Sequence, residues 1–243
     1  MIKVPKIIFF DAVGTLFGVR GTVGEIYSQF AQRAGWDVNP QILNQAFIKI
    51  FRNTSPLGQN HSSQSLSQWE YKWWCDVTRR SFEEAGFYVD AAEFNSFFEP
   101  LFVHFATAKP WQVYPDVSKL LASLKAMGLT LGIISNFDSR LYAVLKALEL
   151  EEWFTSITLS TEVGVSKPEG FIFEAALAKH QCRAEDAWHV GDSWTEDYQG
   201  ASAAGLQGVW LNHEQTELPQ GANPVDPVVE IADLSMLHLI LNP

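Results

Sequence analysis

Three short apolar runs in this chain stop abruptly at polar or glycine residues, and they constrain the fold more than any other feature. The runs are Ile7–Phe10 before Asp11, Leu129–Ile134 before Ser135, and Ala187–Val190 before Gly191 and Asp192. Short apolar runs bounded in this way are typical of strands buried on both faces of a parallel sheet, because helices cover both sides. Two further runs, Ile157–Leu159 and Gly208–Leu211, are also candidate strands.

Helical periodicity fills the intervals between the predicted strands. Val117–Met127 carries apolar side chains at helical spacing, and Gly128 after it is a typical helix stop. Residues 141–148 repeat the pattern, Pro168 is well placed to begin a helix, and Tyr198–Ala204 predicts a short one. Strands that alternate with helices predict an α/β fold, a doubly wound parallel sheet with right-handed crossovers.

The segment 18–109 has a different character, because it holds no convincing buried strand. Its amphipathic stretches are Val23–Ala34, Gln41–Phe51, Leu66–Ala85 and Ala92–Phe105. Residues 53–67, rich in Ser, Asn, Gly and Gln, predict a loop between two of these helices. We therefore expect a helical domain over 18–109, inserted into a core formed by 1–17 and 110–243, with the sheet resuming near Tyr114.

The distribution of charge supports this division and excludes several classes of function. The chain has 17 Lys and Arg against 28 Asp and Glu, a formal charge of −11, and about −10 of it lies outside 18–109. Such an acidic surface repels phosphate backbones and anionic membranes, so we expect neither as a partner. Two cysteines cannot form a disulfide scaffold, and no apolar run is long enough for a secretory signal or a membrane span. We expect a soluble, cytoplasmic protein.

The polar residues at the predicted strand ends are the candidate functional groups. Ligands of open α/β sheets bind beyond the carboxyl ends of the strands, where Asp11, Ser135 and Asp192 are expected. Taken singly, each has a structural explanation as a turn or helix-capping residue, and Lys167 before Pro168 could be a solvated lysine. The combination of these residues in this order is more informative than any one of them.

In this order the strand ends resemble the motifs of the haloacid dehalogenase-like (HAD) hydrolase superfamily. The matching segments are Ile7–Phe17, Leu131–Asp138, Val165–Pro168 and His189–Asp197. The resemblance covers nearly the whole chain and implies a Rossmann-like α/β core. It also implies the subgroup with an α-helical cap inserted between the first and second motifs, which is where the residue pattern places the helical segment.

The resemblance implies a role for each residue of the motifs. Asp11 would be the nucleophile, and Thr15, Ser135 and Asn136 would donate hydrogen bonds to the transferring group or the nucleophile loop. Lys167 would neutralise developing charge and keep the neighbouring carboxylates ionised. Mg²⁺ would be held by Asp11, the Val13 carbonyl, Asp192 and Asp197, with Glu196 as an alternative support. The implied substrate is a small phosphorylated or other anionic metabolite.

Val13 departs from the pattern of the superfamily's phosphatases. These usually have a second Asp two residues after the nucleophile, which acts as general acid and base. Valine cannot exchange a proton, although its backbone carbonyl is retained as a metal contact. The sequence therefore predicts an intact metal site without the general acid and base. Such a group typically contributes about 10²–10⁴-fold to the rate.

Several functions are compatible with this departure. The first is a Mg²⁺-dependent phosphatase or phosphotransfer enzyme that favours leaving groups needing no protonation. The second is a metal-independent 2-haloacid dehalogenase, against which Gly191–Asp192 and Asp197 argue. The third is a catalytically weak protein that binds a phosphorylated ligand or a protein partner. Cleavage of a C–P bond would need a desolvated cap lysine, and neither Lys49 nor Lys72 is distinguished as one.

Two further residues, to which the motifs assign no role, are candidates for substrate binding. Arg20 follows the first loop and could meet a substrate anion, and Trp194 lies within the last motif, near the expected mouth of the site. His189, within a predicted strand, is expected to be buried structure. At the C-terminal end we expect a loop over 213–227 and a helix over Ile231–Leu241.

Overall fold

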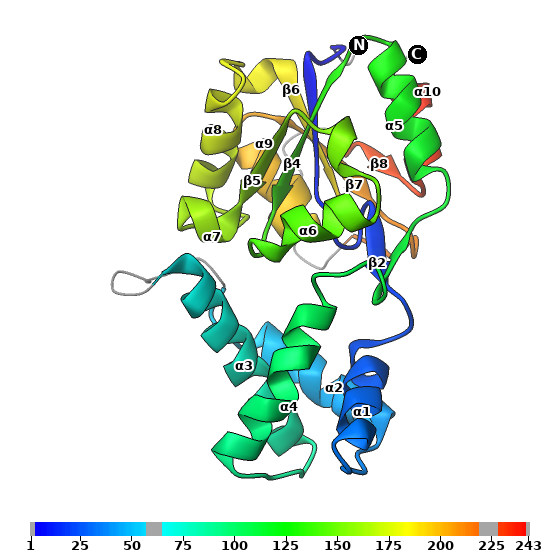
Figure 1. Ribbon diagram of the computed structural model, residues 1–243. Coiled ribbons are helices and arrows are strands. Elements are labelled where there is room, and N and C mark those ends of the chain that lie inside the picture. Colours follow the sequence, from blue (N-terminus) through cyan, green and yellow to red (C-terminus); the bar gives the residue numbers. More distant parts are fainter. Residues whose placement is uncertain (1–2, 57–64, 219–227, 242–243) are drawn as a thin grey trace.

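A six-stranded parallel sheet forms the centre of the computed structural model, which describes residues 3–56, 65–218 and 228–241 (Figure 1). In spatial order the strands are β5 (Ser156–Leu159), β4 (Thr130–Ser135), β1 (Ile7–Phe10), β6 (Ala187–Gly191), β7 (Gln207–Leu211) and β8 (Glu230–Ile231). Strand β1 pairs with β4 and β6, so Phe10 lies beside Ile133 and Val190. The polar residues that follow these three strands are therefore brought to one edge of the sheet.

Helices cover both faces of the sheet, as the unalternating apolar strands predict. They are α5 (Val117–Ala126), α6 (Arg140–Ala147), α7 (Ser160–Val163), α8 (Gly170–Ala178), α9 (Gly200–Ala203) and α10 (Leu237–Leu241). On one face Ile8 and Phe10 pack in a cluster with side chains of α5, α6 and α10. On the other face Ile7 and Phe9 pack with side chains of α8 and α9. The predicted doubly wound α/β fold is confirmed.

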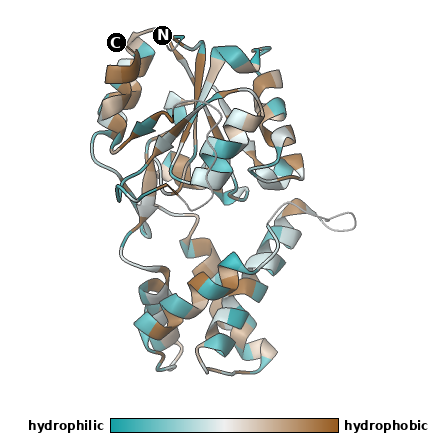
Figure 2. Cartoon of the chain, turned by 180° about the vertical axis from the view of Figure 1, so that it is seen from behind, coloured by the Kyte–Doolittle hydropathy of each residue, from teal (hydrophilic) through white to brown (hydrophobic). Residues whose placement is uncertain are grey.

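Four helices form a separate unit with its own apolar core (Figures 1 and 2). They are α1 (Val23–Arg33), α2 (Pro40–Arg52), α3 (Leu66–Glu84) and α4 (Ala91–His104). Each begins after a side chain that accepts a hydrogen bond from the first turn, and these caps are Thr22, Asn39, Ser65 and Asp90. We call α1–α4 the helical unit. Part of the loop predicted over 53–67 lies outside the described residues.

A small antiparallel ribbon, which the sequence analysis missed, joins the helical unit to the sheet. Strands β2 (Phe17–Val19) and β3 (Trp111–Val113) pair with each other rather than with the main sheet. Each has only three residues, too few for a periodic pattern to identify. The sheet resumes at Thr130, not near Tyr114 as expected, and the expected boundary between residues 17 and 18 falls within β2.

Three other predictions need correction at the ends of elements. The helix expected from Ile231 begins later, because Ile231 pairs with Leu211 in β8 and a 3₁₀ turn over Leu234–Met236 precedes α10. The helix expected from Pro168 begins at Gly170. The short helix expected over Tyr198–Ala204 is α-helical only over Gly200–Ala203, because a π-helix, Trp194–Gln199, precedes it. Part of the loop predicted over 213–227 lies outside the described residues.

Candidate active site

Three carboxylates converge at the carboxyl edge of the sheet. Asp11 follows β1, Asp192 follows β6, and Asp197 lies in the π-helix after β6. One oxygen of each lies within 4.8 Å of the others, with Asp11 and Asp197 buried and Asp192 exposed. The backbone holds Asp11 in place, since its N–H donates to the Val190 carbonyl at 2.9 Å. Clustered carboxylate oxygens are the ligand type that Mg²⁺ prefers, so this donor set fits the ion that the sequence implies.

Lys167 provides the positive charge at the centre of this cluster. Its ammonium group donates to Asp11 Oδ1 and to Asp197 Oδ1, both at 2.6 Å, and the residue is only 2% exposed. Asn136 binds the backbone of Lys167 through both groups of its side chain. Its Oδ1 accepts from the Lys167 N–H at 2.8 Å, and its Nδ2 donates to the Lys167 carbonyl at 3.0 Å. In this structure Asn136 therefore positions Lys167.

Burial and mutual proximity shift the pKa values of these groups. The pKa of Asp11 is raised to about 8, mainly by burial; Lys167 opposes the rise, and the nearby Asp197 and Asp192 add to it. Burial alone would lower the pKa of Lys167, but the two carboxylates that it contacts hold that pKa above its ordinary value. A bound cation would lower the pKa of Asp11 and so favour the ionised form that a nucleophile requires.

His189 orients Asp197 from within the sheet. It is fully buried, as expected, and its Nε2 lies 2.9 Å from Asp197 Oδ1. Burial lowers the pKa of His189, so the ring is neutral at pH 7 and donates its single N–H to the carboxylate. Together with the Ser193 N–H, which donates to Asp197 Oδ2 at 2.9 Å, it fixes both oxygens of this side chain. Nothing in the sequence pattern assigned His189 this contact.

Two glycines make room for the carboxylates. Gly14 has a positive φ of 99°, and a Cβ atom there would lie 2.5 Å from the Asp192 carboxylate. A Cβ at Gly191 would overlap the Asp197 carboxylate. Any side chain at either position would displace a carboxylate of the cluster, which explains the glycine in the first and last motifs.

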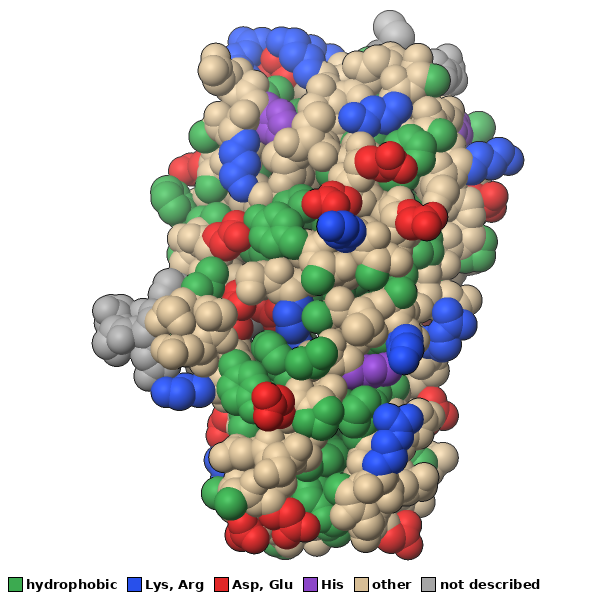
Figure 3. All heavy atoms as spheres, viewed as in Figure 1, with side chains coloured by type: hydrophobic (Ala, Val, Ile, Leu, Met, Phe, Trp, Pro, Cys, Tyr) green, Lys and Arg blue, Asp and Glu red, His purple; other side chains and the backbone are tan. Residues whose placement is uncertain are grey.

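A cavity of about 330 Å³ lies between the carboxylate cluster and the helical unit. Asp11, Asp192 and Asp197 line its wall on the side of the sheet, together with Val13, Ser135 and Asn136. The opposite wall consists mainly of aromatic side chains of α2, α3 and α4. Figure 3 shows the surface hollowed between the sheet and the helical unit, with acidic and basic side chains visible inside.

Of the remaining predicted residues, Glu196 lines this cavity, but Thr15, Arg20 and Trp194 do not. Thr15 is buried beneath it and donates to Asp192 Oδ1 at 3.3 Å. Arg20 is exposed and donates to the Trp111 carbonyl at 3.3 Å. Trp194 is buried, stacked on Tyr198 with ring centroids 4.5 Å apart. The structure thus gives Arg20 and Trp194 packing contacts where the sequence suggested substrate contacts.

Neither candidate lysine for C–P cleavage lines the cavity. Lys49 pairs with Glu84 at 2.6 Å, and Lys72 lines a different hollow, on the outside of α3. The basic side chain that does line the cavity, within the described part of the chain, is Arg140. Arg140 lies just beyond the second motif, at the start of α6, where no pattern in the sequence distinguishes it.

Arg140 belongs to a contact that fastens α3 and α4 to the loop after β4. Its guanidinium donates twice to the Asp138 carboxylate, at 2.9 and 2.6 Å, and lies 3.9 Å from the centroid of the Phe102 ring. Trp74 donates its indole N–H to the same carboxylate at 2.5 Å. Glu70 accepts from the Ser139 N–H and hydroxyl. We call the contact of Glu70 and Trp74 of α3 with Ser139 and Asp138 of the loop the latch.

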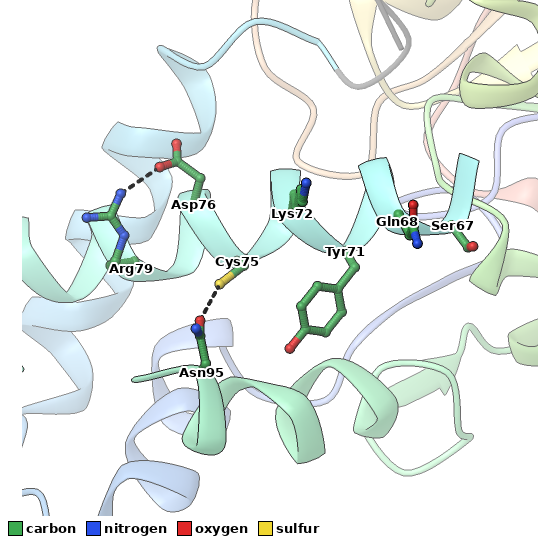
Figure 4. Close-up of a pocket in the computed structure, with 8 residues that line it drawn as sticks. All are labelled: Ser67, Gln68, Tyr71, Lys72, Cys75, Asp76, Arg79 and Asn95. Carbon is green, nitrogen blue, oxygen red and sulfur yellow. Dashed lines mark hydrogen bonds and ion pairs between the residues drawn. The ribbon is translucent and has the colours of Figure 1, made fainter. Parts of the chain in front are cut away.

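A larger hollow, of about 910 Å³, lies away from this site on α3 and α4 (Figure 4). Two pairs of the polar groups drawn there contact each other, Arg79 with Asp76 at 2.9 Å and the Cys75 thiol with Asn95 at 3.6 Å. Among the described residues that line it, there are no convergent carboxylates and no buried charged side chain. The cavity over Asp11 is therefore the candidate active site.

Comparison with known sequences agrees with this geometry. The family model of haloacid dehalogenase-like hydrolases matches residues 5–205. Haloacid dehalogenase-like hydrolase domain-containing protein 3 of Danio rerio is 30% identical over 233 residues, covering 95% of each chain. The glyceraldehyde 3-phosphate phosphatase of Methanothermobacter thermautotrophicus is 36% identical over 143 residues, covering 57% of this chain and 62% of the relative.

Solved structures share the fold at low sequence identity. The HAD hydrolase YfnB of Bacillus subtilis, solved with bound magnesium, superposes with a TM-score of 0.69 at 19% identity, covering 99% of this chain and all of that one. A 2-haloacid dehalogenase of Pseudomonas syringae gives 0.66 at 23% identity, covering 98% of both chains. Because metal-bound and dehalogenase structures both match, the fold does not discriminate between the chemistries. Within the described residues, no helix combines the length and apolarity that a membrane crossing requires.

Proposed function

Because this chain belongs to the haloacid dehalogenase-like hydrolase family, we propose that it is a Mg²⁺-dependent phosphatase or phosphotransfer enzyme acting on a small phosphorylated metabolite. The observation that carries the proposal is the convergence of Asp11, Asp192 and Asp197 around Lys167, within 4.8 Å of one another. A dehalogenase has no need of a metal site. Both relatives reported above have names of hydrolases, and one is named as a phosphatase.

In the proposed reaction the Asp11 carboxylate is the nucleophile. One of its oxygens forms a bond to phosphorus, the bond from phosphorus to the leaving oxygen breaks, and an aspartyl phosphate results. Water then attacks this phosphorus, which releases inorganic phosphate and restores Asp11. Lys167 stabilises the charge on the nucleophile side throughout, and its Nζ already lies 2.6 Å from Asp11 Oδ1.

Mg²⁺ would be held by Asp11, Asp192, the Val13 carbonyl and, directly or through water, Asp197. The ion supplies neutralisation of the phosphate dianion, which a carboxylate nucleophile would otherwise repel. The pKa of Asp11 is raised to about 8, so the nucleophile also requires a nearby positive charge to remain ionised. His189 and Ser193 keep Asp197 in place for this role.

Val13 lines the cavity where the second Asp of phosphatases of the superfamily would stand. The leaving oxygen therefore departs unprotonated and takes its proton from water. Leaving groups that are stable as anions, such as carboxylates and phenolates, are favoured over alkoxides.

We further propose that the segment 18–109 acts as the cap of this site, and that the protein works in the cytoplasm.

Acetyl phosphate tests the proposal, because its acetate leaving group is small and stable as an anion. We expect the protein to consume acetyl phosphate in a reaction that requires Mg²⁺, stops with EDTA and is absent in Asp11→Asn. The acetyl phosphate that remains is measured by its conversion to a hydroxamate. Metal-independent release of chloride from 2-chloropropionate would support the dehalogenase alternative. The absence of both activities in a folded protein would leave a binding protein and overturn the proposal.

A further inference from the structure

The wall of the cavity opposite Asp11 is apolar and lacks charged side chains of its own. Aromatic side chains of α2, α3 and α4 form most of it, among them Phe47, Phe51, Trp74, Phe98 and Phe102. Within the described residues, the helical unit contributes no Asp, Glu, Lys or Arg to this wall. A second charged group on a substrate would lose its hydration there without gaining a partner.

The polar groups near this wall are already paired. Tyr27 and Thr78, both buried, lie 3.2 Å apart at their hydroxyl oxygens. The charge of Arg140, which enters from the sheet side, is balanced by the buried Asp138 carboxylate through two hydrogen bonds. The wall thus offers few free polar groups to a polyhydroxylated substrate such as a sugar phosphate.

The volume of the cavity limits what this wall can accept. About 330 Å³ lies at the lower end of the roughly 300–1,000 Å³ found for small-molecule sites. Aromatic walls favour flat rings, which stack or meet ring edges at low cost. Phe51 already shows this geometry within the protein, stacked on Phe47 at 5.5 Å and on Trp74 at 5.9 Å between ring centroids.

The absence of an acid at position 13 selects for the same kind of leaving group. Without a proton donor, the leaving group must be stable as an anion, and a phenolate meets this requirement far better than an alkoxide. The cavity wall and the nucleophile loop are formed by different parts of the chain. Two independent features of the site therefore favour one substrate class.

We infer that the substrate is a phosphate monoester of a phenol-like alcohol whose ring bears no second charge. This inference rests on the proposed phosphatase function, and it assigns the phosphate to the Asp11 end of the cavity and the ring to the aromatic wall. Phe47, Phe51 and Trp74 are then specificity residues.

A pair of aryl phosphates separates the effect of the wall from that of the leaving group. Phenyl phosphate and 3-carboxyphenyl phosphate release phenols of nearly equal acidity, but the second carries an additional negative charge on its ring. With Mg²⁺ we expect kcat/KM for phenyl phosphate to be at least about tenfold higher, because the carboxylate must be desolvated against the wall. Equal values, or a preference for the charged ester, would overturn the inference.

A cation placed on the wall gives the matched test. Phe51 lines the cavity yet is 43% exposed, so Phe51→Arg should fold, and we expect the preference for phenyl phosphate to fall at least about threefold. Ile42→Arg places the same side chain on α2, at an exposed position that does not line the cavity, and should leave the preference unchanged. An unchanged preference in Phe51→Arg would show that the wall does not select substrates.

Acetyl phosphate keeps the two proposals distinguishable, since its acetyl group does not depend on an aromatic wall. If acetyl phosphate is consumed in an Mg²⁺- and Asp11-dependent reaction while both aryl esters are inert, the phosphatase function stands and the inferred substrate class is wrong. If all three are inert, the proposed function fails and the substrate class fails with it.

Discussion

Val13 lies in the cavity next to the nucleophile and offers the site only a backbone carbonyl and an aliphatic side chain. Two residues away, Asp11, the proposed nucleophile, accepts a hydrogen bond from Lys167. In the proposed reaction the site therefore has the parts that would form a bond to phosphorus, but it lacks the part that would protonate the departing oxygen. This separation predicts which substitution should change the reaction most.

We expect Val13→Asp to raise turnover of alkyl phosphates by about 10²–10⁴-fold, the usual contribution of a general acid and base. Aryl phosphates and acetyl phosphate should gain much less, because their leaving groups need no proton. Steady-state rates with both kinds of ester measure this difference. Val13→Asn is the control of nearly equal shape that cannot act as a general acid or base, and equal rates for the Asp and Asn variants would contradict the explanation.

Asp186 carries a second arrangement of buried charge, far from the cavity. Its side chain is buried just before β6 and accepts hydrogen bonds from Lys3 and Lys6, which lie just before the neighbouring β1. These hydrogen bonds hold the pKa of Asp186 below its ordinary value. The contact therefore ties together the beginnings of two central strands.

The lowered pKa of Asp186 gives a pH dependence of known sign. Its contribution to stability is fully present above the unfolded pKa, about 3.9, and is lost as pH falls toward the folded value. We expect Asp186→Asn to lower the free energy of unfolding at pH 5–7, and the difference from wild type to shrink below about pH 4. Urea unfolding across this range measures it. A constant difference down to pH 2.5 would contradict the lowered pKa.

At the scale of elements, the sequence predicted the helices and strands that a continuous stretch of residues specifies. It missed the features that depend on contacts between distant segments. The helices of 18–109 were predictable because the apolar periodicity of each lies within one continuous stretch of residues. Asp11, Lys167 and Asp192 were predictable because strand ends and motif order bring them together. The pairing of β2 with β3 joins residues nearly a hundred positions apart and leaves no local pattern.

The latch was unpredictable for the same reason. The hydrogen bonds of Glu70 to Ser139 exist only because α3 packs on the loop after β4, and neither segment signals the other in the sequence. The same holds for the contact of Trp74 with Asp138. Sequence patterns therefore predicted the carboxylate cluster at one end of the cavity and left the opposite wall unassigned.

The latch should stabilise the protein measurably, because Glu70 is only 1% exposed. We expect Glu70→Ala to lower the free energy of unfolding by about 1.5–3 kcal/mol, the typical contribution of hydrogen bonds to a charged group. Glu83→Ala on the same helix removes an exposed pair with Arg79 and should cost at most about 0.5 kcal/mol. Urea unfolding of both variants tests this, and equal losses would show that the latch is not a stabilising contact.

At the scale of the whole molecule, the excess negative charge lies outside the helical unit. Residues 18–109 carry only about −1 of the total −11. The three carboxylates of the cluster are part of that excess, crowded within 4.8 Å and compensated by a single buried lysine. A divalent cation at this point relieves repulsion, so its binding should stabilise the folded state as a whole.

We expect millimolar Mg²⁺ to raise the thermal unfolding temperature of the wild type, by mass action on the folded state. Asp192→Asn should abolish most of this rise, because it removes a ligand without adding bulk. Asp116→Asn makes the same substitution at an exposed residue outside the cluster and should keep the rise. Differential scanning calorimetry with and without Mg²⁺ measures it, and an equal rise in all three proteins would place the ion elsewhere.

The ribbon of β2 and β3 carries both crossings of the chain between the helical unit and the sheet. Its pairing is extended at both ends, since the Arg20 N–H donates to the Pro110 carbonyl at 2.7 Å and the Tyr114 N–H to the Leu16 carbonyl at 3.0 Å. Two separate linkers would leave the helical unit free to reorient relative to the sheet. Two paired strands instead form a ribbon that resists stretching along its length but bends more easily. Opening and closing would then follow a single mechanical coordinate, and each closure would return the aromatic wall to the same alignment over Asp11.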